Sequence, residues 1–141
     1  MTEGALTLET NANHSDIAAI SQFLNDYNAD QGLVYNPVPL SVFIRDQNGV
    51  VLAGLTGSTH WGWLRIKLLA VGKANRRAGL GGQLLAAAEK EAIERGCKFA
   101  FVDTFTFQAA PFYEKNGYER FAELDDYPAG EKRIFLRKKL Q

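Results

Sequence analysis

The sequence predicts a mixed α/β fold, classed as α+β in some schemes, with a mostly antiparallel sheet and one central parallel strand pair. Three observations support this prediction. Alternating apolar segments flank an Asn-Gly turn in the first half of the chain. An apolar strand, a glycine-rich loop, a helical pattern and a second apolar strand then follow, which is the order of a parallel crossover unit. Two further strand patterns close the chain.

Length and composition indicate a single domain over residues 1–141. Hydrophobic residues make up 46% and charged residues 23%, which are ordinary values for a globular protein. The 16 basic and 16 acidic side chains leave no net charge, which argues against a nucleic-acid partner. A single cysteine, Cys97, excludes an intrachain disulfide and a thiolate metal cluster, so no metal is expected. No signal-peptide pattern or run of roughly 18 apolar residues is present, so we expect a cytoplasmic protein without a membrane partner.

The first third of the chain predicts a strand, a helix and a loop. Residues 5–10 alternate apolar and polar side chains, as a short strand does. Asn13 or Ser15 can cap the helix that follows, whose apolar residues share one stripe and which ends near Gly32. Residues 30–39 contain two prolines and are predicted to form a loop.

Three consecutive strands are predicted next, over residues 40–46, 50–59 and 60–71. The Asn-Gly step between the first two is a strong hairpin signal. Glycines are unusual inside a strand, so Gly54 and Gly57 in the second strand indicate a bulge or a close backbone approach.

The remaining predicted elements alternate between helices and strands. In chain order they are a helix over 80–95, a strand over 97–104, a short helix over 109–116, and strands over 118–124 and 133–140. The first helix provides the crossover that a parallel pair of strands needs.

The segment Arg76–Gly82 has the composition of an anion-binding loop. Backbone N–H groups at a helix start have no intrahelical partner, and the helix dipole favours negative charge there. Glycines let a ligand approach the main chain closely, and two arginines add cationic groups. We therefore predict that this loop holds the pyrophosphate of a nucleotide-like cofactor.

Two common phosphate-binding loops do not fit this segment. A Walker loop requires Gly-Lys-Ser/Thr, whereas Gly82 is followed by Gln83. The dinucleotide fingerprint G-x-G-x-x-G matches at Gly79 and Gly81 but has Leu84 in place of the third glycine. Repeated βαβ units, which that fingerprint requires, are also missing from the predicted order of elements.

A third pattern, R-x-x-G-x-G at Arg76, Gly79 and Gly81, fits the loop. It resembles the acyl-CoA signature of the GNAT superfamily of N-acetyltransferases. Residues 109–118 look like the family's A-x-x-x-Y-x-x-x-G-F segment, and a helix and a strand separate the two motifs. The order of elements over residues 5–140 is similar to the GNAT fold, in which the central parallel strands splay around the cofactor.

The resemblance implies an enzyme that transfers an acetyl group from acetyl-CoA to a primary amine, on a small molecule, by direct attack in a ternary complex. Backbone groups of the strand end would hold the pantetheine arm and stabilise the developing negative charge, and the loop amides would hold the pyrophosphate. Thr106 stands where the family often has an asparagine that contacts the cofactor arm. The implied cofactor-binding residues are Leu69, Val71, Arg76, Arg77, Gly79, Leu80, Gly81, Gly82 and Thr106.

Tyr113 occupies the family's tyrosine position, so the resemblance implies that its phenol gives a proton to the departing thiolate. The group that deprotonates the amine stays open. Some relatives use a glutamate on the strand before the loop, but the corresponding position lies near Arg65, which cannot act as a base. Asp30, Asp103, His60 and a water chain are the alternatives.

The expected acceptor pocket combines aromatic walls with one carboxylate, which suits a small primary amine. Its predicted residues are Tyr27, Asp30, Tyr35, Trp61 and Trp63. The same aromatic residues would also suit a hydrophobic core or a dimer surface, and family analogy makes a homodimer possible. Two other functions stay open at this stage: a non-catalytic acyl-CoA-binding regulatory module, and an acetyltransferase of protein lysines or N-termini.

Overall fold

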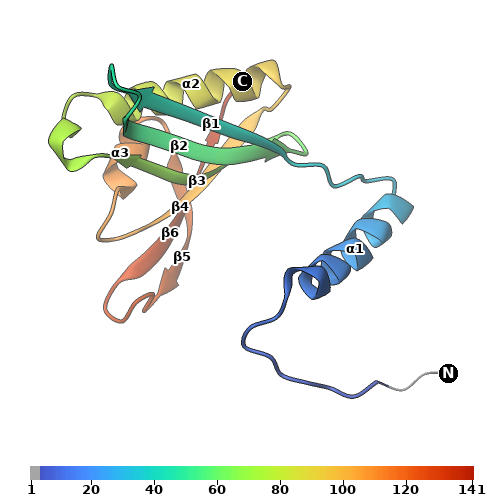
Figure 1. Ribbon diagram of the computed structural model, residues 1–141. Coiled ribbons are helices and arrows are strands. Elements are labelled where there is room, and N and C mark those ends of the chain that lie inside the picture. The colour runs from blue at the N-terminus through green and yellow to red at the C-terminus, as the bar shows by residue number, and fades with distance from the viewer. Residues whose placement is uncertain (1–3) are drawn as a thin grey trace. The chain divides into compact units, whose positions relative to one another are not determined.

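The structure is a computed structural model that describes residues 4–141 (Figure 1). The contacts within the chain define two compact units, residues 1–36 and 37–141. The single acyltransferase domain stays a prediction. No helix of the described residues is both long enough and apolar enough to cross a membrane.

The first unit contains one helix, α1 (His14–Asp30). The predicted cap is confirmed at Asn13, whose Oδ1 accepts a hydrogen bond from the Asp16 N–H at 2.9 Å. The strand predicted over residues 5–10 is wrong, because this segment has no regular secondary structure. Leu6 and Leu8 are almost fully exposed, and an alternating segment becomes a strand only where another strand pairs with its backbone.

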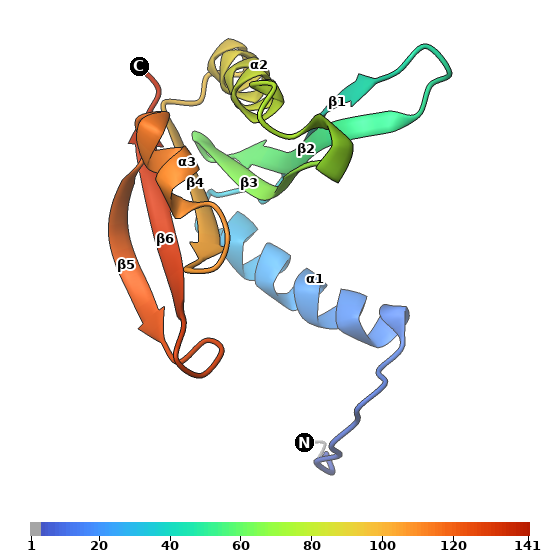
Figure 2. The ribbon, with the colours of Figure 1, turned by 90° about the vertical axis from the view of Figure 1, so that its left-hand side faces the viewer.

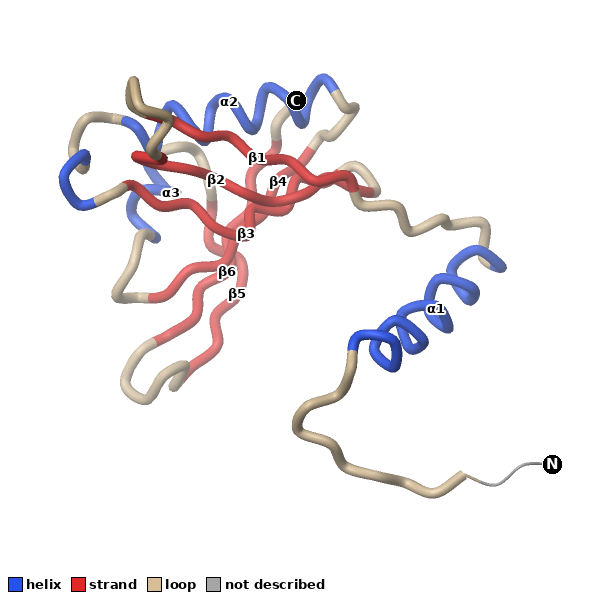
Figure 3. The backbone as a smooth tube through the Cα atoms, in the orientation of Figure 1, coloured by secondary structure: helices blue, strands red, loops and turns tan. Residues whose placement is uncertain are grey.

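The second unit is built on one six-stranded sheet (Figure 3). Its strands lie in the spatial order β1-β2-β3-β4-β6-β5. They are β1 (Val38–Arg45), β2 (Val51–His60), β3 (Trp63–Val71), β4 (Phe99–Phe105), β5 (Glu119–Asp125) and β6 (Lys132–Lys139). The β3–β4 pair is parallel and all other pairs are antiparallel. The predicted fold class, with its central parallel pair, is confirmed.

Two helices complete this unit, together with a short 3₁₀ turn, η1 (Lys73–Asn75). The helix α2 (Leu80–Glu94) is the crossover between β3 and β4 and packs against β1, β2 and β3 (Figure 2). The helix α3 (Ala110–Lys115) precedes β5. Both helices contribute to one hydrophobic core, whose largest fully buried side chains are Leu55, Leu64, Leu84, Leu85, Ile134 and Leu136.

The turns define where the first strands end. The Asn-Gly turn is confirmed: Gly49 has a φ of +82°, and the Asp46 carboxylate accepts hydrogen bonds from the N–H groups of Asn48 and Val50. The third strand was predicted to start at residue 60, but β3 begins at Trp63. Trp61 and Gly62 both have positive φ and form the tight turn of the β2–β3 hairpin. The alternating sequence pattern continues across this turn and therefore does not mark the start of β3.

The central strands separate because β3 carries a bulge. In the β2–β3 register Thr56 pairs with Leu68 and Gly57 with Ile66, so Lys67 is an extra residue. The parallel β3–β4 pairing runs from Trp63 and Phe99 only as far as Ile66 and Val102. Beyond that point the two strands diverge, and the last residues of β3 pair on one side only.

Gly57 makes the bulge possible. A Cβ atom built on Gly57 would lie 2.0 Å from the carbonyl oxygen of Arg65, which is a backbone atom and cannot move away cheaply. The close approach that the sequence predicts for a strand glycine is therefore confirmed at this position.

We expect Gly57→Ala to lower the free energy of unfolding by about 3 kcal/mol, because the added methyl group forces β2 away from β3. Gly82→Ala is the matched control, because a Cβ atom at Gly82 meets no atom within 4 Å. That control should keep or slightly raise the stability, since alanine favours a helix over glycine. Chemical denaturation measures both, and equal stabilities would contradict the assigned role of Gly57.

Candidate functional site

A cleft of about 1050 Å³ lies in the second unit where β3 and β4 diverge. Its walls come from the end of β3, the loop after it, the first turn of α2, residues 104 and 107–109, and α3. Sheet pairing fixes the position of β3 on one side of the cleft, and packing in the hydrophobic core fixes α2 and α3 on the other side. The bulge that separates the strands thus also opens the cleft.

The N-terminus of α2 points unpaired amide groups at the cleft wall. Its N-cap is Gly79, which has a φ of +75° and provides no side-chain hydrogen bond. The N–H groups of Leu80, Gly81 and Gly82 therefore have no intrahelical acceptor and no side-chain cap. A Cβ atom on Gly82 would meet open space, and one on Gly81 would come within 3.2 Å of the Phe112 ring. The first turn of α2 is accordingly free to receive an anion.

The charges around the cleft all have one sign. Lys67, Arg76, Arg77 and Lys115 line it, and no acidic side chain does so among the described residues. The Arg76 Nε donates to the Val71 carbonyl at 3.4 Å, which ties the loop to the end of β3. Four cations beside a helix N-terminus make a site for a strongly anionic ligand.

Tyr113 on α3 lines the same cleft and is only 4% exposed. Its ring makes edge-on contacts with the rings of Phe112 and Tyr118, at centroid distances of 5.1 and 5.7 Å. Burial, and secondarily the carboxylate of Asp103, raise the pKa of Tyr113 to about 12. The phenol therefore keeps its proton at neutral pH and is a hydrogen-bond donor toward the cleft.

A partly buried polar cluster holds the elements behind Tyr113 together. The Tyr118 hydroxyl donates to Glu89 Oε2 on α2 at 2.8 Å, and Lys138 Nζ on β6 donates to Glu89 Oε1 at 2.9 Å. Lys138 Nζ also donates to the Asn116 carbonyl at the end of α3. Burial and the Glu89 carboxylate raise the pKa of Tyr118, so it stays a donor. The cluster fixes α2 and α3 to the same strand.

Comparison with known proteins identifies the family. Residues 39–120, which are more than half of the chain and include the glycine loop and Tyr113, match the acetyltransferase (GNAT) domain family. The chain belongs to the GNAT acetyltransferase family. The matched segment contains every residue that lines the cleft between the diverging strands.

Individual GNAT relatives agree with this assignment. The chain is 42% identical over 96 residues to a blasticidin-S acetyltransferase of Streptomyces morookaense, covering 65% of this chain and 71% of that protein. A crystal structure of an acetyltransferase from Agrobacterium tumefaciens is 33% identical, with a TM-score of 0.90 over 96% of this chain and 99% of that one. An aminoglycoside 6'-N-acetyltransferase complexed with coenzyme A shares the fold, with a TM-score of 0.66 at 18% identity over 92% of this chain and 82% of that one.

The structure brings nearly all the predicted GNAT cofactor residues to one cleft. The predicted residues that line it are Leu69, Val71, Arg76, Arg77, Gly79, Leu80, Gly81, Gly82 and Tyr113. Thr106 is not among the lining residues, whereas its neighbours Thr104 and Gln108 are, with Thr104 Oγ1 donating to Gln108 Oε1 at 3.1 Å.

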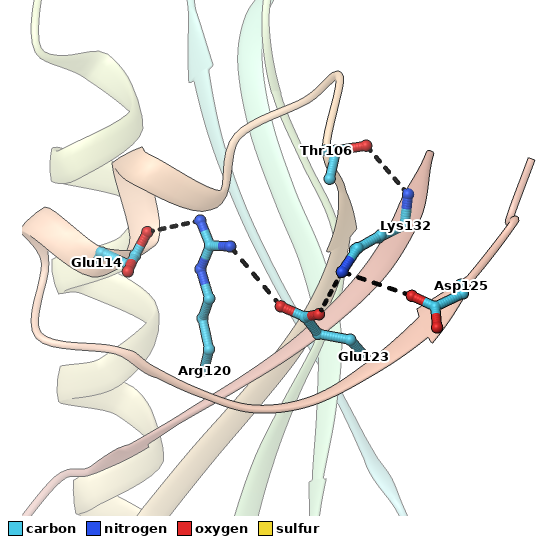
Figure 4. A network of polar contacts seen from close by, with 6 residues as sticks. All are labelled: Thr106, Glu114, Arg120, Glu123, Asp125 and Lys132. Carbon is cyan, nitrogen blue, oxygen red and sulfur yellow. Dashed lines mark hydrogen bonds and ion pairs between the residues drawn. The ribbon is translucent and has the colours of Figure 1, made fainter. Parts of the chain in front are cut away.

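The Thr106 hydroxyl is used by the β5–β6 connection (Figure 4). It accepts from the Lys132 N–H at 3.1 Å and donates to the carboxylate of Glu131. An exposed ion-pair network continues from Lys132 through Glu123. Its other members are Asp125, Arg120 and Glu114, the last of which follows Tyr113 on α3. Thr106 thus anchors a neighbouring loop, and its predicted contact with the cofactor stays a prediction.

Asp103 and His60, the two second-unit candidates for the group that deprotonates the amine, do not line the cleft. Asp103 is ion-paired with Arg133, whose Nη2 and Nε lie 2.8 and 2.9 Å from its Oδ1. That hydrogen bond raises the pKa of Arg133. His60 ends β2, beside the ring of Trp61 at a centroid distance of 5.4 Å. The other carboxylate candidate, Asp30, is the last residue of α1 in the first unit.

The predicted acceptor residues are divided between the two units. Tyr27, Asp30 and Tyr35 belong to residues 1–36, and Trp61 and Trp63 to the second unit. Trp61 is in the β2–β3 turn and half exposed. Trp63 packs on the rings of Phe99 and Phe101, at centroid distances of 4.8 and 5.9 Å. Neither tryptophan lines the cleft, and their role in acceptor binding stays a prediction.

The sequence did not predict six polar residues of the cleft, which are Lys67, Asn75, Thr104, Gln108, Lys115 and Asn116. Lys115 stands two residues after Tyr113, so the second motif could have indicated it. Lys67 has no comparable signal, because only the bulge turns it out of the alternation of β3.

We expect the free energy of unfolding to fall as the pH rises from about 10 to about 12, because the unfolded chain loses the Tyr113 proton near its usual pKa of 10 whereas the folded protein keeps it to about 12. Within this window the unfolded state binds fewer protons, so each such tyrosine contributes a slope of about 1.4 kcal/mol per pH unit. Tyr113→Phe should flatten the decline, and urea denaturation at several pH values measures it. An identical slope in this variant would contradict the raised pKa.

Proposed function

We propose that this acetyltransferase takes its acetyl group from acetyl-CoA and transfers it to a primary amine on a small molecule, by direct attack within a ternary complex. The observation that carries the proposal is the cleft itself, where uncapped amides of α2 meet four basic side chains and no acidic one among the described residues. The multiply phosphorylated half of coenzyme A needs such a site. The coenzyme A bound to the aminoglycoside 6'-N-acetyltransferase of the same fold is further support.

Different residues of the cleft bind different parts of acetyl-CoA. The amides of Leu80, Gly81 and Gly82 bind the pyrophosphate, with Arg76 and Arg77 as flanking cations. The end of β3 has an edge without a strand partner beyond Ile66, and its backbone groups hydrogen-bond the pantetheine arm. Acetyl-CoA supplies an acetyl group that is activated as a thioester. Binding both substrates in one cleft orients the amine toward the acetyl carbon, which lowers the barrier through proximity.

Tyr113 and the β3 backbone serve the bond-breaking step. The amine nitrogen bonds to the acetyl carbon, and the carbon–sulfur bond breaks. A backbone N–H near Leu69 or Val71 stabilises the negative charge that develops on the acetyl oxygen. The Tyr113 phenol, still protonated at neutral pH, gives its proton to the departing sulfur.

Water removes the proton of the amine in this proposal, and the Tyr113 phenolate regains a proton from water after the thiol has formed. No carboxylate lines the cleft among the described residues, and Asp103 is held by Arg133. The acceptor is therefore expected to react as its small neutral fraction at pH 7, and the rate should rise with pH until the amine is fully deprotonated.

A small-molecule amine is the proposed acceptor class. The Streptomyces morookaense relative, at 42% identity, is named for its action on blasticidin S, and the aminoglycoside enzyme of the same fold for an aminoglycoside. Trp63 stacks on Phe99 and meets Phe101 edge-on, which gives an aromatic cluster on the same sheet. An assay of thiol release from acetyl-CoA across blasticidin S, aminoglycosides, simple amines and a lysine peptide tests the proposal. Turnover only with the peptide would overturn it.

We expect Gly82→Leu to weaken acetyl-CoA binding at least 10-fold without unfolding the protein. The leucine side chain would fill the open space beside the first turn of α2, where the pyrophosphate is placed, and a helix tolerates leucine well. Ala86→Leu is the matched control, because it adds the same side chain to an exposed position of the same helix outside the cleft. Calorimetric titration with acetyl-CoA measures both. Equal affinities would place the donor elsewhere.

We expect Tyr113→Phe to lower kcat about 10²-fold with little change in the dissociation constant of acetyl-CoA, as loss of a general acid does. The phenylalanine keeps the ring contacts with Phe112 and Tyr118, so the fold should persist. Phe112→Leu, next to it on α3, is a control that perturbs packing but removes no proton donor. Turnover measured at saturating acetyl-CoA compares them, and an unchanged kcat in Tyr113→Phe would exclude the acid role.

A further inference from the structure

The charges of the chain are divided between its two units. Residues 1–36 contain five acidic side chains and no lysine or arginine. Residues 37–141 contain all 16 basic side chains and the other 11 acidic ones. The first unit therefore carries a net charge of −5 and the second +5, although the whole chain is neutral. Opposite net charges of this size attract residues 1–36 of one copy to the surface of residues 37–141 of another copy.

The helix α1 has an apolar stripe that is exposed along its length. Its large apolar side chains are 50–71% exposed, and no residue of α1 is buried. They recur at the spacing of one helix face and are Ile17, Ile20, Phe23, Leu24 and Tyr27. The acidic residues of the helix are Asp16, Asp26 and Asp30. Most of the stability of such a helix comes from packing of its amphipathic face, so we expect another surface to cover this stripe.

The second unit has an apolar sheet surface with the basic residue Arg45 beside it. The strands β1–β3 bury one face against α2, and alternate residues face the other way. On β1 and β2, a hollow of about 350 Å³ includes Phe43, Leu52, Gly54 and Thr56, without a charged side chain. Phe43 is half exposed and packs over Gly54, and the Arg45 guanidinium lies 4.9 Å from its ring.

We propose that α1 of one copy docks on this sheet surface of a second copy, and reciprocally, to form a homodimer by exchange of the N-terminal unit. The apolar stripe fits the uncharged hollow, and the acidic residues of α1 meet the basic unit. A helix of 17 residues is about 25 Å long and about 10 Å wide. One such contact is small, but the reciprocal pair doubles it toward the roughly 1,600 Å² of a stable interface.

The connection between the units favours exchange between copies. Only residues 31–37 separate the end of α1 from the start of β1, and Pro37 and Pro39 restrict the backbone there. Short, stiff hinge segments promote exchange of an identical element between protomers, because the exchanged contact uses the same residues without bending the hinge.

Light scattering coupled to size-exclusion chromatography tests this proposal on the full chain. At micromolar concentration we expect twice the chain mass of 15.6 kDa. Ile20→Asp in the stripe and Phe43→Asp in the hollow should each weaken the dimer about 30-fold or more, as removal of a central apolar anchor does. Ala18→Asp adds the same charge on the opposite side of α1 and is the matched control, which should leave the dimer intact. Raising the salt concentration should weaken the wild-type dimer.

Several outcomes would overturn the proposal. A wild-type monomer at 50 µM would mean that each chain covers its own stripe or leaves it free. A dimer that persists in Ile20→Asp or in Phe43→Asp would place the interface elsewhere. Circular dichroism and the melting temperature of each variant confirm that the second unit is still folded, since both substituted side chains are half exposed or more.

Discussion

The close contact between Gly57 and the backbone of Arg65 determines the geometry of the site. Only a glycine allows β2 to approach β3 so closely, and the approach coincides with the extra residue Lys67. The bulge increases the local twist and bends β3, so that the parallel ladder with β4 stops after four residue pairs. Strand divergence gives the cleft its volume, leaves the end of β3 with an unpaired edge, and turns Lys67 toward the cleft. One steric constraint in the sheet thus determines the opening between β3 and β4.

The cleft is kept in shape by contacts on its far side. Glu89 accepts hydrogen bonds from Tyr118 and Lys138, and Lys138 also reaches the carbonyl of Asn116. The α2 helix, which presents the anion-binding amides, and α3, which presents Tyr113, are therefore tied to β6. Buried polar groups that are fully paired hold one arrangement of the elements around them. The site needs this rigidity, because catalysis by orientation of the substrates tolerates little displacement of the groups that bind them.

The sequence predicts much of the second unit because its signals are local. The glycine loop, the apolar face of α2 and the Asn-Gly turn each depend on a few neighbouring residues, and the cofactor residues from Leu69 to Gly82 gather in one cleft as expected. Three features could not be found in this way. Residues 5–10 would form a strand only beside a partner strand, which local sequence does not reveal. The start of β3 depends on the positive φ of Trp61, and the position of Lys67 depends on a bulge. The Thr106 hydroxyl is taken by Lys132 and Glu131, which are distant in sequence.

The central claim is that the uncapped first turn of α2 and the unpaired end of β3 together bind acetyl-CoA. Backbone amide chemical shifts recorded by NMR during titration with acetyl-CoA test it residue by residue. The account predicts that the largest changes fall on Leu80, Gly81 and Gly82 and on the end of β3 from Leu68 to Val71, at a stoichiometry of one ligand per chain. Saturable shifts that leave both segments unchanged, or no shifts at millimolar acetyl-CoA, would contradict it.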